Sequence, residues 1–194
     1  MILVDWQIAD VISNGEISIS PYLSERINPN SYDVCLGSSF VRFPETSEPL
    51  NPFDQNEVES YGIPFQTEEA FTLQPGECIL GETIEYIRLS RGIVAAIEGK
   101  SSLARLFLEV HKTGGWIDAG FEGTITLEIQ NNLPRPFTII PGMPIAQVVF
   151  HRTYMCRHPY GERKSSKYQG QTGATQSRYH IYPTHDTNQD IITC

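Results

Sequence analysis

Residues 98–128 read EGKSSLARLFLEVHKTGGWIDAGFEGTITLE and hold the local signals on which both the fold and the site depend. Ser101 is a suitable helix N-cap, and Leu103, Leu106 and Phe107 recur behind it at helical spacing. A glycine-rich bend follows, and the stretch ends in an alternating pattern that stops on a carboxylate. The sequence therefore predicts a short helix, a tight bend and a strand, in this order.

The start of the predicted helix has features of a phosphate-binding turn. Free backbone N–H groups at a helix start attract an anion, and the preceding Gly99-Lys100 pair adds a cation beside them. Ser101 and Arg105 are four residues apart, so they share one helical face and can touch one ligand. An ordinary capped helix with a solvent-facing arginine is the competing interpretation, and these residues alone leave the two equally open.

Segment 124–130 alternates between apolar and polar residues, which predicts a β-strand. Its apolar face is formed by Ile125, Leu127 and Ile129. Its polar face carries Thr124, Thr126, Glu128 and Gln130. That polar face is either solvated or lines a site, and a single glutamate on such a face is most often solvated.

Size, charge and cysteine content narrow the functional classes. The 194 residues favour one domain with a sizeable core. A formal charge of −9 and a pI near 5.0 argue against a nucleic-acid surface. No apolar run spans a membrane and no signal peptide opens the chain, which predicts a cytoplasmic protein. We expect free thiols, because there is no C-x-x-C pair among Cys35, Cys78, Cys156 and Cys194.

The remainder of the chain predicts a mainly β fold. Residues 3–13 form an amphipathic helical pattern with Asp5 as its expected cap. Short strand patterns separated by turn residues follow at 38–43, 70–73, 78–86 and 92–98. Regularly spaced short strands are typical of an all-β barrel or sandwich. Residues 44–69, rich in Pro, Glu, Ser and Asn, predict a long irregular surface insertion.

Two Pro-Gly turns, at 74–77 and 140–143, each lie between apolar strand patterns. They are either related turns in the two halves of a double-stranded β fold or a coincidence. From 146 to 150 both strand faces are apolar except at Gln147, whose side chain needs a hydrogen-bond partner from the protein or from a nucleotide. The tail 179–194 has no functional interpretation, and a dangling or subunit-bracing segment is expected.

Several motifs together resemble the dCTP deaminases, which belong to the trimeric dUTPase superfamily. Besides residues 98–128, the resemblance rests on 27–37 (INPNSYDVCLG), which is similar to the family's N-terminal S-x-D-x-x-L-G segment. Residues 141–147 (PGMPIAQ) resemble its Pro-Gly-Met strand. Its C-terminal nucleotide-closing segment is matched by 158–161 (HPYG) and 167–174 (KYQGQTGA).

These matches follow the family order and span roughly residues 1–178. They imply a single dCTP deaminase/dUTPase-like domain over 1–194, with the tail 179–194 outside the resemblance. The implied fold is mainly β, a distorted β-barrel or double-stranded β fold of the dUTPase type with short helices. The implied assembly is a homotrimer with shared active sites, in which Glu128 and the helix at Ser101 meet across a subunit boundary.

The resemblance implies a deaminase that works without zinc. Most nucleobase deaminases carry H-x-E and P-C-x-x-C zinc motifs, and neither motif occurs in this sequence. The resemblance assigns the general base to Glu128, and the holding of the attacking water to Ser101, Arg105 and the backbone carbonyl of Gly114. Arg105 would also stabilise the developing charge. Gly114 stands where the best-known members carry alanine, a tolerable change if only the carbonyl is used.

The resemblance also implies how the substrate, dCTP, is bound. The triphosphate is assigned to Lys100, Ser101, Ser102, Lys167, Tyr160 and Gln171. Asp118 would accept from the sugar 3′-hydroxyl, and the backbone of 126–128 would read the pyrimidine edge. Leu103, Ala104, Arg105, Thr126, Leu127, Glu128 and Gln147 complete the implied binding set. No residue is assigned as a metal ligand, because Mg²⁺ is expected to arrive with the triphosphate.

Some members of the family release dUTP, whereas others continue to dUMP and diphosphate. Single-function members tend to carry a bulky polar and basic pair before Ile117, and this chain has Gly115-Trp116. The pair resembles the dual-function members, so the expected reaction forms dUMP. His111 and Thr113 lie in the segment that rearranges in the family when dTTP binds, which predicts feedback inhibition by dTTP.

Three other functional classes compete with this interpretation. A plain dUTPase carries a tyrosine on the turn at 118–121, and this chain has Phe121 there. A catalytically silent binding paralogue would be expected to lack Ser101, Arg105 or Glu128, and all three are present. A structural β-sandwich, such as a capsid module, would not need this set of polar residues.

Overall fold

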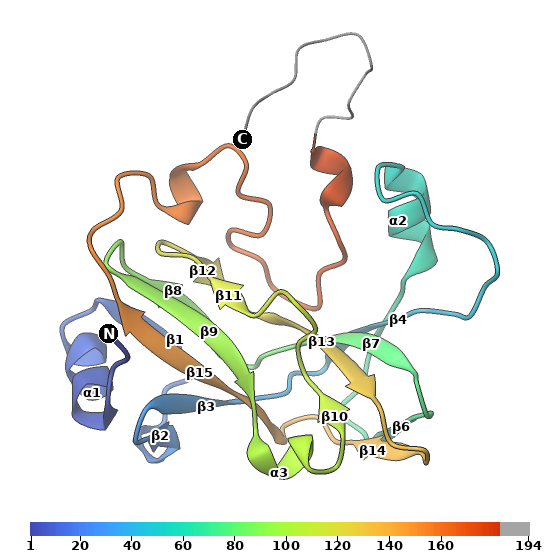
Figure 1. Ribbon diagram of the computed structural model, residues 1–194, viewed down its shortest axis with the longest axis horizontal. Helices are drawn as coiled ribbons and strands as arrows, with labels where there is room; N and C mark the ends of the chain where they lie inside the picture. Colours follow the sequence, from blue (N-terminus) through green and yellow to red (C-terminus); the bar gives the residue numbers. More distant parts are fainter. Residues whose placement is uncertain (183–194) are drawn as a thin grey trace, which may run out of the picture.

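The computed structural model describes residues 1–182 as a mainly β protein with few short helices (Figure 1). The greater part of the tail predicted at 179–194 lies outside the described residues. The α-helices are α1 (Asp5–Ser13), α2 (Gln55–Tyr61) and α3 (Ser101–Ala104). Single 3₁₀ turns are η1 (Ser24–Arg26), η2 (Tyr160–Glu162) and η3 (Tyr179–Ile181). In this part of the chain, no helix has the length and apolar character needed to cross a bilayer.

The strands form four sheets, and every pairing between strands is antiparallel. One five-stranded sheet has the order β10 (Leu108–Glu109), β13 (Thr126–Asn131), β7 (Cys78–Glu82), β4 (Ser39–Arg42), β5 (Ile63–Gln66). The other has the order β11 (Trp116–Ile117), β9 (Ile93–Gly99), β15 (Pro144–Arg152), β3 (Ser31–Cys35), β2 (Ile27–Asn28). A three-stranded sheet has the order β1 (Ile17–Ser20), β8 (Tyr86–Leu89), β12 (Glu122–Gly123). A two-stranded sheet pairs β14 (Phe137–Ile139) with β6 (Phe71–Leu73). Each sheet has two open edges, so none closes into a barrel within residues 1–182.

Alternating burial explains why these short segments form strands. In β9, Ile93, Ala95 and Ile97 are buried while the residues between them are more exposed. Successive strand residues point to opposite faces, so this alternation places one face of the sheet in the core. The core also holds the fully buried aromatic side chains of Tyr32, Phe40 and Phe150.

Two of the predicted helices begin one residue away from their predicted caps. Val4 occupies the N-cap of α1, and Asp5 is the first helical residue, where its carboxylate accepts from the backbone N–H of Trp6. Lys100 similarly occupies the N-cap of α3, which ends after one turn at Ala104. The predicted helical spacing does not extend to Phe107, because that residue has a left-handed φ of +57°.

Three predicted segments differ in extent from the structure. The predicted strand at 78–86 is divided into β7 and β8, because the Thr83 hydroxyl bonds to the Glu85 carbonyl and to the Ile125 N–H. The insertion at 44–69 is only partly irregular, since it contains α2 and β5. The strand predicted at 124–130 begins at Thr126, because the Thr124 N–H donates to Gln171 instead of to a neighbouring strand.

The two predicted Pro-Gly turns are confirmed as turns. Gly76 and Gly142 have φ values of +79° and +84°, a conformation that glycine adopts without steric cost. The strands that precede the turns, β6 and β14, pair with each other. The thiols of Cys35, Cys78 and Cys156 are free, as predicted.

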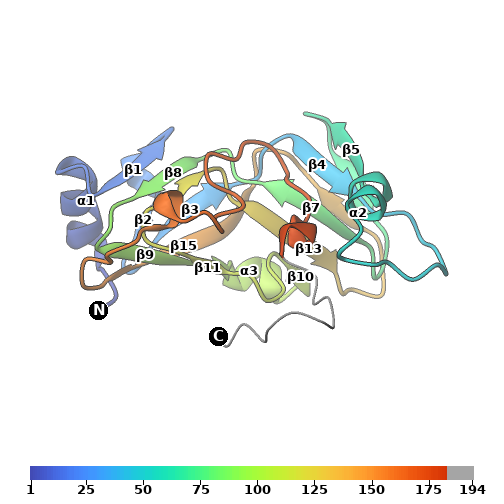
Figure 2. The same ribbon diagram turned by 90° about the horizontal axis from the view of Figure 1, so that it is seen from above.

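The arrangement of the elements separates two functional regions. Figure 1 shows α3 at the lower edge and the C-terminal segment after β15 at the upper edge, with β13 between them. Helices α1 and α2 lie at opposite ends of the molecule in both views (Figures 1 and 2). The candidate residues are therefore distributed over two edges of the fold.

Candidate active site

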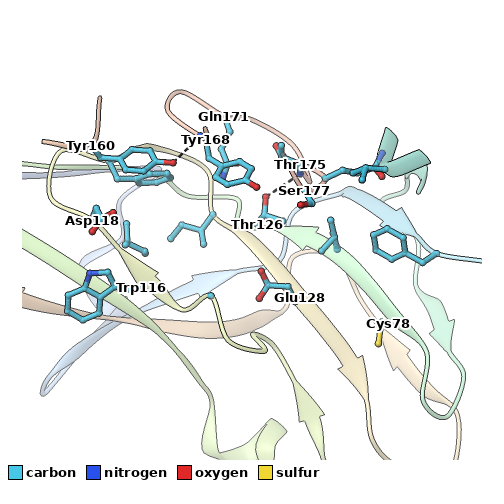
Figure 3. Close-up of a pocket in the computed structure, with 18 of the residues that line it drawn as sticks. Cys78, Trp116, Asp118, Thr126, Glu128, Tyr160, Tyr168, Gln171, Thr175 and Ser177 are labelled. Atoms are coloured by element: carbon cyan, nitrogen blue, oxygen red, sulfur yellow. Dashed lines mark hydrogen bonds between the residues drawn. The ribbon is translucent and has the colours of Figure 1, made fainter. Parts of the chain in front are cut away.

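A cavity of about 690 Å³ lies between the polar face of β13, the residues around β11 and the C-terminal segment (Figure 3). Seven of the residues predicted from the sequence line it: Gly114, Trp116, Asp118, Thr126, Glu128, Tyr160 and Gln171. These residues come from three separate stretches of the chain. A mainly apolar pocket with a few convergent polar side chains is the expected form of a small-molecule site.

Strand β13 positions Glu128 at the centre of this cavity. Leu127 and Ile129 are fully buried, so the alternate residues Thr126 and Glu128 face the cavity. A register shift of one residue would bury the carboxylate and expose the two apolar side chains, so the register is strongly specified. On the edge of β13 away from β7, no strand within residues 1–182 pairs with 126–128.

The glycine-rich bend lies against the carboxylate of Glu128. The backbone N–H of Lys112 donates to Glu128 Oε2 at 3.2 Å. A Cβ placed on Gly114 would lie 3.6 Å from Glu128 Oε1, which is ordinary van der Waals contact. The Lys112 N–H was not predicted as part of the site, because a backbone donor carries no residue-specific signal in the sequence.

Gly115 and Trp116 have different environments. The Gly115 carbonyl accepts from the Ile97 N–H at 2.7 Å, and a Cβ on Gly115 would lie only 3.1 Å from the Ile97 carbonyl oxygen. A side chain at position 115 would therefore press against the backbone of β9 unless that backbone moved by a few tenths of an ångström. Trp116 lines the cavity with 59% of its surface exposed, and its ring lies 5.8 Å from the ring of His151.

The turn that carries Asp118 is joined to the C-terminal segment. Gly120 has a φ of +86°, and the Phe121 N–H donates to the Asp118 carbonyl at 3.1 Å. The Tyr160 N–H donates to the Ala119 carbonyl at 2.8 Å, and the rings of Phe121 and Tyr160 are 6.0 Å apart. The position where a plain dUTPase would carry tyrosine is thus packed against another aromatic residue.

Tyr160 and Gln171 fix the closing segment at the rim of the cavity. The Tyr160 hydroxyl accepts from the backbone N–H groups of Lys167 and Tyr168, both at 3.1 Å. The Gln171 amide donates to the Thr124 carbonyl at 2.8 Å. Its Oε1 is buried and has no hydrogen-bond partner within residues 1–182, which leaves one acceptor available beside the cavity.

The predicted residues of the α3 region do not reach this cavity. Ser101, Ser102, Ala104 and Arg105 are exposed at the lower edge of the fold, and Leu103 packs against the core (Figure 1). The Lys100 ammonium pairs with Asp33 at 2.5 Å. In the described part of the chain, neither a hydrogen bond nor an ion pair links Glu128 to Ser101 or Arg105.

Besides Gly115, three other predicted residues also lie away from the cavity lining. The side chain of Leu127 is fully buried in the core, so only its backbone is available. Gln147 bonds to the Ser31 hydroxyl at 2.7 Å and to the Gly99 carbonyl at 3.2 Å, so the protein itself supplies its partners. The Lys167 ammonium lies 2.9 Å from the centre of the Tyr182 ring.

An apolar wall of the cavity was missed from the sequence. It is formed by Phe43, Leu50, Val58, Tyr61 and Leu80, several of them from the insertion that contains α2. Asp54 caps α2 by accepting from the N–H groups of Asn56 and Glu57. An acidic residue three positions before Glu57 was a readable capping signal in the sequence. Tyr168, Thr175 and Ser177 also line the cavity.

Among residues 1–182, Cys78 is the one cysteine that lines this cavity, and it lies on the side of Glu128 away from Asp118 (Figure 3). Desolvation by the surrounding protein raises the pKa of its thiol, so the thiol stays protonated near neutral pH. Within residues 1–182, no group of three or more His, Cys, Asp or Glu residues could hold a metal ion. The acidic side chains among the described residues that line the cavity are those of Glu128 and Asp118.

Comparison with known proteins relates this geometry to a family. A family model described as dCTP deaminase-like matches residues 2–153. A protein from Methanospirillum hungatei named "dCTP deaminase, dUMP-forming" is 51% identical over 180 residues, which are 93% of this chain and 97% of that protein. A protein of the same name from Mycobacterium avium is 42% identical over 181 residues, with 92% and 95% of the two chains covered.

A solved structure supports the fold. The crystal structure of 2′-deoxycytidine 5′-triphosphate deaminase from Agrobacterium tumefaciens superposes with a TM-score of 0.61 at 22% identity. The match covers 77% of this chain and 46% of the Agrobacterium chain. From the family match and the near full-length similarity to these relatives, we conclude that the chain belongs to the dCTP deaminase-like family.

Proposed function

We propose that the protein is a dUMP-forming dCTP deaminase, which converts dCTP and water to dUMP, diphosphate and ammonia. The observation that carries this proposal is the convergence of Glu128, Gly114 and Asp118 on one cavity, in a chain similar over almost its full length to relatives of that name. The family's first reaction needs a base beside the pyrimidine, and Glu128 is the carboxylate at the centre of the cavity.

In the proposed deamination, Glu128 acts as the general base and later as the general acid. Its carboxylate takes a proton from a water held by the Gly114 carbonyl, the water oxygen bonds to C4 of cytosine, and the C4=N3 double bond opens as N3 receives that proton. Glu128 then transfers the second proton of the added water to the amino group, and the C4–N4 bond breaks to release ammonia and leave the C4 carbonyl of uracil. The Lys112 N–H at 3.2 Å from Oε2 holds the carboxylate in place and leaves Oε1 toward Gly114.

Arg105 and Ser101 are proposed to complete the site from a neighbouring subunit. Both lie outside the cavity of their own chain and are exposed at another edge of the fold. Exposed polar residues there are available to a second copy, which supports the homotrimer with shared sites. Arg105 would then stabilise the charge that develops on the tetrahedral adduct. The same assembly is proposed to form the distorted, double-stranded β-barrel architecture of the dUTPase type.

The nucleotide is proposed to lie along the polar side of the cavity. Asp118 accepts from the 3′-hydroxyl, and the backbone of 126–128, which has no strand partner on one edge, reads the pyrimidine. Tyr160, Lys167 and Gln171 of the closing segment bind the triphosphate, together with Lys100, Ser101 and Ser102 of the neighbour. The cation of Lys167 is consistent with this role.

Mg²⁺ is proposed to enter as part of the substrate. Mg²⁺ is a hard cation that prefers oxygen ligands, and the phosphate oxygens of the nucleotide supply them. When bound, the ion neutralises charge on the triphosphate. Lys100 and Lys167 would contribute the protein's own positive charge to the same phosphates.

The second reaction is proposed from the names of the relatives and from the Gly115-Trp116 pair. In this reaction, water cleaves the bond between the α-phosphorus and the oxygen that bridges to the β-phosphate. An exposed aromatic ring at 116 adds no positive charge beside the phosphates, and it leaves room for a second water. We also propose that dTTP inhibits the enzyme through the His111–Thr113 segment, which adjoins Glu128 through Lys112. Full activity at saturating dTTP would refute that inhibition.

The test is a product analysis of purified protein with dCTP and Mg²⁺. Ammonia is measured enzymatically, and the nucleotides and diphosphate by ion-exchange chromatography and phosphorus NMR. We expect one ammonia, one dUMP and one diphosphate per dCTP. Accumulation of dUTP would identify a monofunctional deaminase, and conversion of added dUTP but not of dCTP would identify a plain dUTPase.

A further inference from the structure

Residues 171–177, here named the strap, run between two cavities. Gln171, Thr175, Gln176 and Ser177 line the cavity that contains Glu128. Thr172, Gly173 and Ala174 line a second cavity of about 680 Å³ on the other side, together with Glu82 and Ser39. The strap therefore forms a partition with one face toward the proposed nucleotide site and the other toward strands β4 and β7.

The rear face of the strap is held by two side chains from those strands. The Gly173 N–H donates to Glu82 Oε2 at 2.6 Å, and the Ala174 N–H donates to the Ser39 hydroxyl at 3.1 Å. A hydrogen bond to a carboxylate is shorter and stronger than one between neutral groups. Within residues 1–182, the Gly173 N–H is the hydrogen-bond donor found for the Glu82 carboxylate.

Two glycines provide the space for this contact. A Cβ on Gly37 would lie 2.8 Å from Glu82 Cγ, so only glycine lets the Glu82 side chain pass close to the backbone there. Gly173 has a φ of +78°, and a Cβ on it would lie 3.2 Å from the Ser39 hydroxyl oxygen. Gly37 ends the N-terminal motif at 27–37, and Gly173 belongs to the C-terminal motif at 167–174. Neither glycine has a role in the proposed chemistry.

The front face of the strap is joined to the start of β13. The Thr175 N–H donates to the Thr126 hydroxyl at 3.2 Å, and the Gln171 carbonyl accepts from the Thr124 N–H at 3.0 Å. Three successive strap amides, those of residues 173–175, thus donate to side chains of the sheet. Because Thr126 and Glu128 share one face of β13, the position of the strap is coupled to the proposed base.

We propose that Glu82 is a positioning residue, which holds the strap and thereby places Gln171 beside the nucleotide. This inference rests on the proposed function for its effect on catalysis, but not for the contact itself. Glu82 does not line the cavity that contains Glu128, so it acts through the strap. Its removal leaves the reacting groups in place and releases the segment that binds the triphosphate.

The first measurement is hydrogen–deuterium exchange of the free protein, read on peptides that cover 171–177. In Glu82→Ala, we expect exchange at these amides to become about tenfold faster, because the charged acceptor is lost. Glu82→Gln keeps a neutral acceptor and is expected to recover most of the protection. Ser39→Ala should give a smaller increase. The matched control is Glu68→Ala, which removes a carboxylate lining the same second cavity but without a hydrogen bond to the strap in the described residues.

The second measurement is the kinetics of dCTP conversion by the same variants. For Glu82→Ala we expect KM to rise about tenfold while kcat changes less than about threefold, a pattern that general destabilisation would not produce. Unchanged strap exchange in Glu82→Ala would overturn the anchoring. Faster exchange with an unchanged KM would overturn its role in nucleotide binding. If the unaltered protein does not convert dCTP, the proposed function fails, while the exchange data still decide whether Glu82 holds the strap.

Discussion

The residues expected to act on one nucleotide occupy two regions with opposite characters. The cavity region gathers Glu128, Asp118 and Gln171 on one concave surface, and its elements are tied together by backbone hydrogen bonds. The α3 region presents Ser101 and Arg105 as exposed residues, which line neither of the two cavities described above. The cavity region therefore contains the proposed base but not Arg105, and the α3 region contains Arg105 but not the base.

This difference supports the proposal that each site takes residues from two subunits. A carboxylate base and a guanidinium that stabilises the adduct must both reach the same atoms of the substrate. Within residues 1–182, the Glu128 carboxylate accepts from the Lys112 N–H, and neither a hydrogen bond nor an ion pair joins it to Arg105. The comparison therefore favours a site assembled from two copies, each supplying a different half. Four changes test it, from the largest expected effect to the smallest.

Replacement of the base should have the largest effect. Glu128→Gln preserves shape on β13 and removes proton transfer, so we expect ammonia release to fall by roughly 10³-fold or more. Nucleotide binding, measured by calorimetry with dCTP, should stay within about threefold. Glu109→Gln on the neighbouring strand β10, outside the cavity lining, is the control. Near-normal turnover in Glu128→Gln would remove the cavity region from the mechanism.

Arg105→Ala tests the other half of the comparison. Although Arg105 lies outside the cavity of its own chain, we expect kcat to fall by about 10²-fold, as when one stabilising group is lost from a transition state. Arg135→Ala, an exposed arginine on the turn between β13 and β14, should be nearly silent. Equal activity of the two variants would mean that the α3 region has no part in the reaction.

Trp116→Arg sharpens the distinction between one reaction and two. Trp116 is exposed, so the substitution should leave the fold intact, whereas a Cβ at Gly115 would press against the Ile97 carbonyl oxygen at 3.1 Å. A positive charge beside the phosphates is expected to raise the dUTP released relative to dUMP by several-fold, on the order of the effect of one close charge pair. Chromatography of the products measures the ratio. An unchanged ratio would separate Trp116 from the second reaction.

The smallest expected effect is on stability near β3, the strand whose residue Asp33 pairs with Lys100 of the α3 region. Glu85 is fully buried, pairs with Arg26 and accepts from the backbone N–H of Cys35, at the end of β3, at 2.9 Å. Burial raises the pKa of the Glu85 carboxyl, so the folded state binds its proton more tightly than the unfolded state does. Its contribution to stability is therefore complete at low pH and is lost as the pH rises from about 4.5 through the raised pKa.

Urea unfolding across this pH range measures the contribution. In Glu85→Gln the group no longer titrates, so the fall in unfolding free energy above pH 4.5 should be smaller than in the unaltered protein, by on the order of 1 kcal/mol. Asp10→Asn, an exposed acidic residue on α1, is the control. Parallel pH profiles for the unaltered protein and Glu85→Gln would assign the pH dependence to other groups.

Local patterns predicted the cavity region better than the α3 region. The alternation at 124–130 predicted the face on which Glu128 lies. Because Leu127 and Ile129 are buried on one face of the strand, the Glu128 carboxylate must point to the opposite face. Helical spacing beyond Ser101 was misleading, since the left-handed conformation of Phe107 ends α3 after one turn. Spacing reports periodicity, but it does not report where tertiary contacts stop a helix.

Contacts between distant residues could not be predicted from such patterns. Glu82 and Gly173 are separated by 91 positions, and nothing in either local sequence indicates their hydrogen bond. The partners of Gln147 were likewise undecided until Ser31 and Gly99 were placed beside it. The helix α2 was missed although its cap at Asp54 was readable, because the surrounding Pro and Ser residues indicated irregular structure.

The most direct test of the two-region account is complementation between inactive subunits. Glu128→Gln and Arg105→Ala chains carrying different tags are co-expressed, and the mixed oligomers are assayed with dCTP. If each site takes Glu128 from one chain and Arg105 from its neighbour, random assembly of a trimer restores about a quarter of the sites. We predict ammonia release at that level, far above either variant alone. Activity no greater than that of the separate variants would contradict a site shared between subunits.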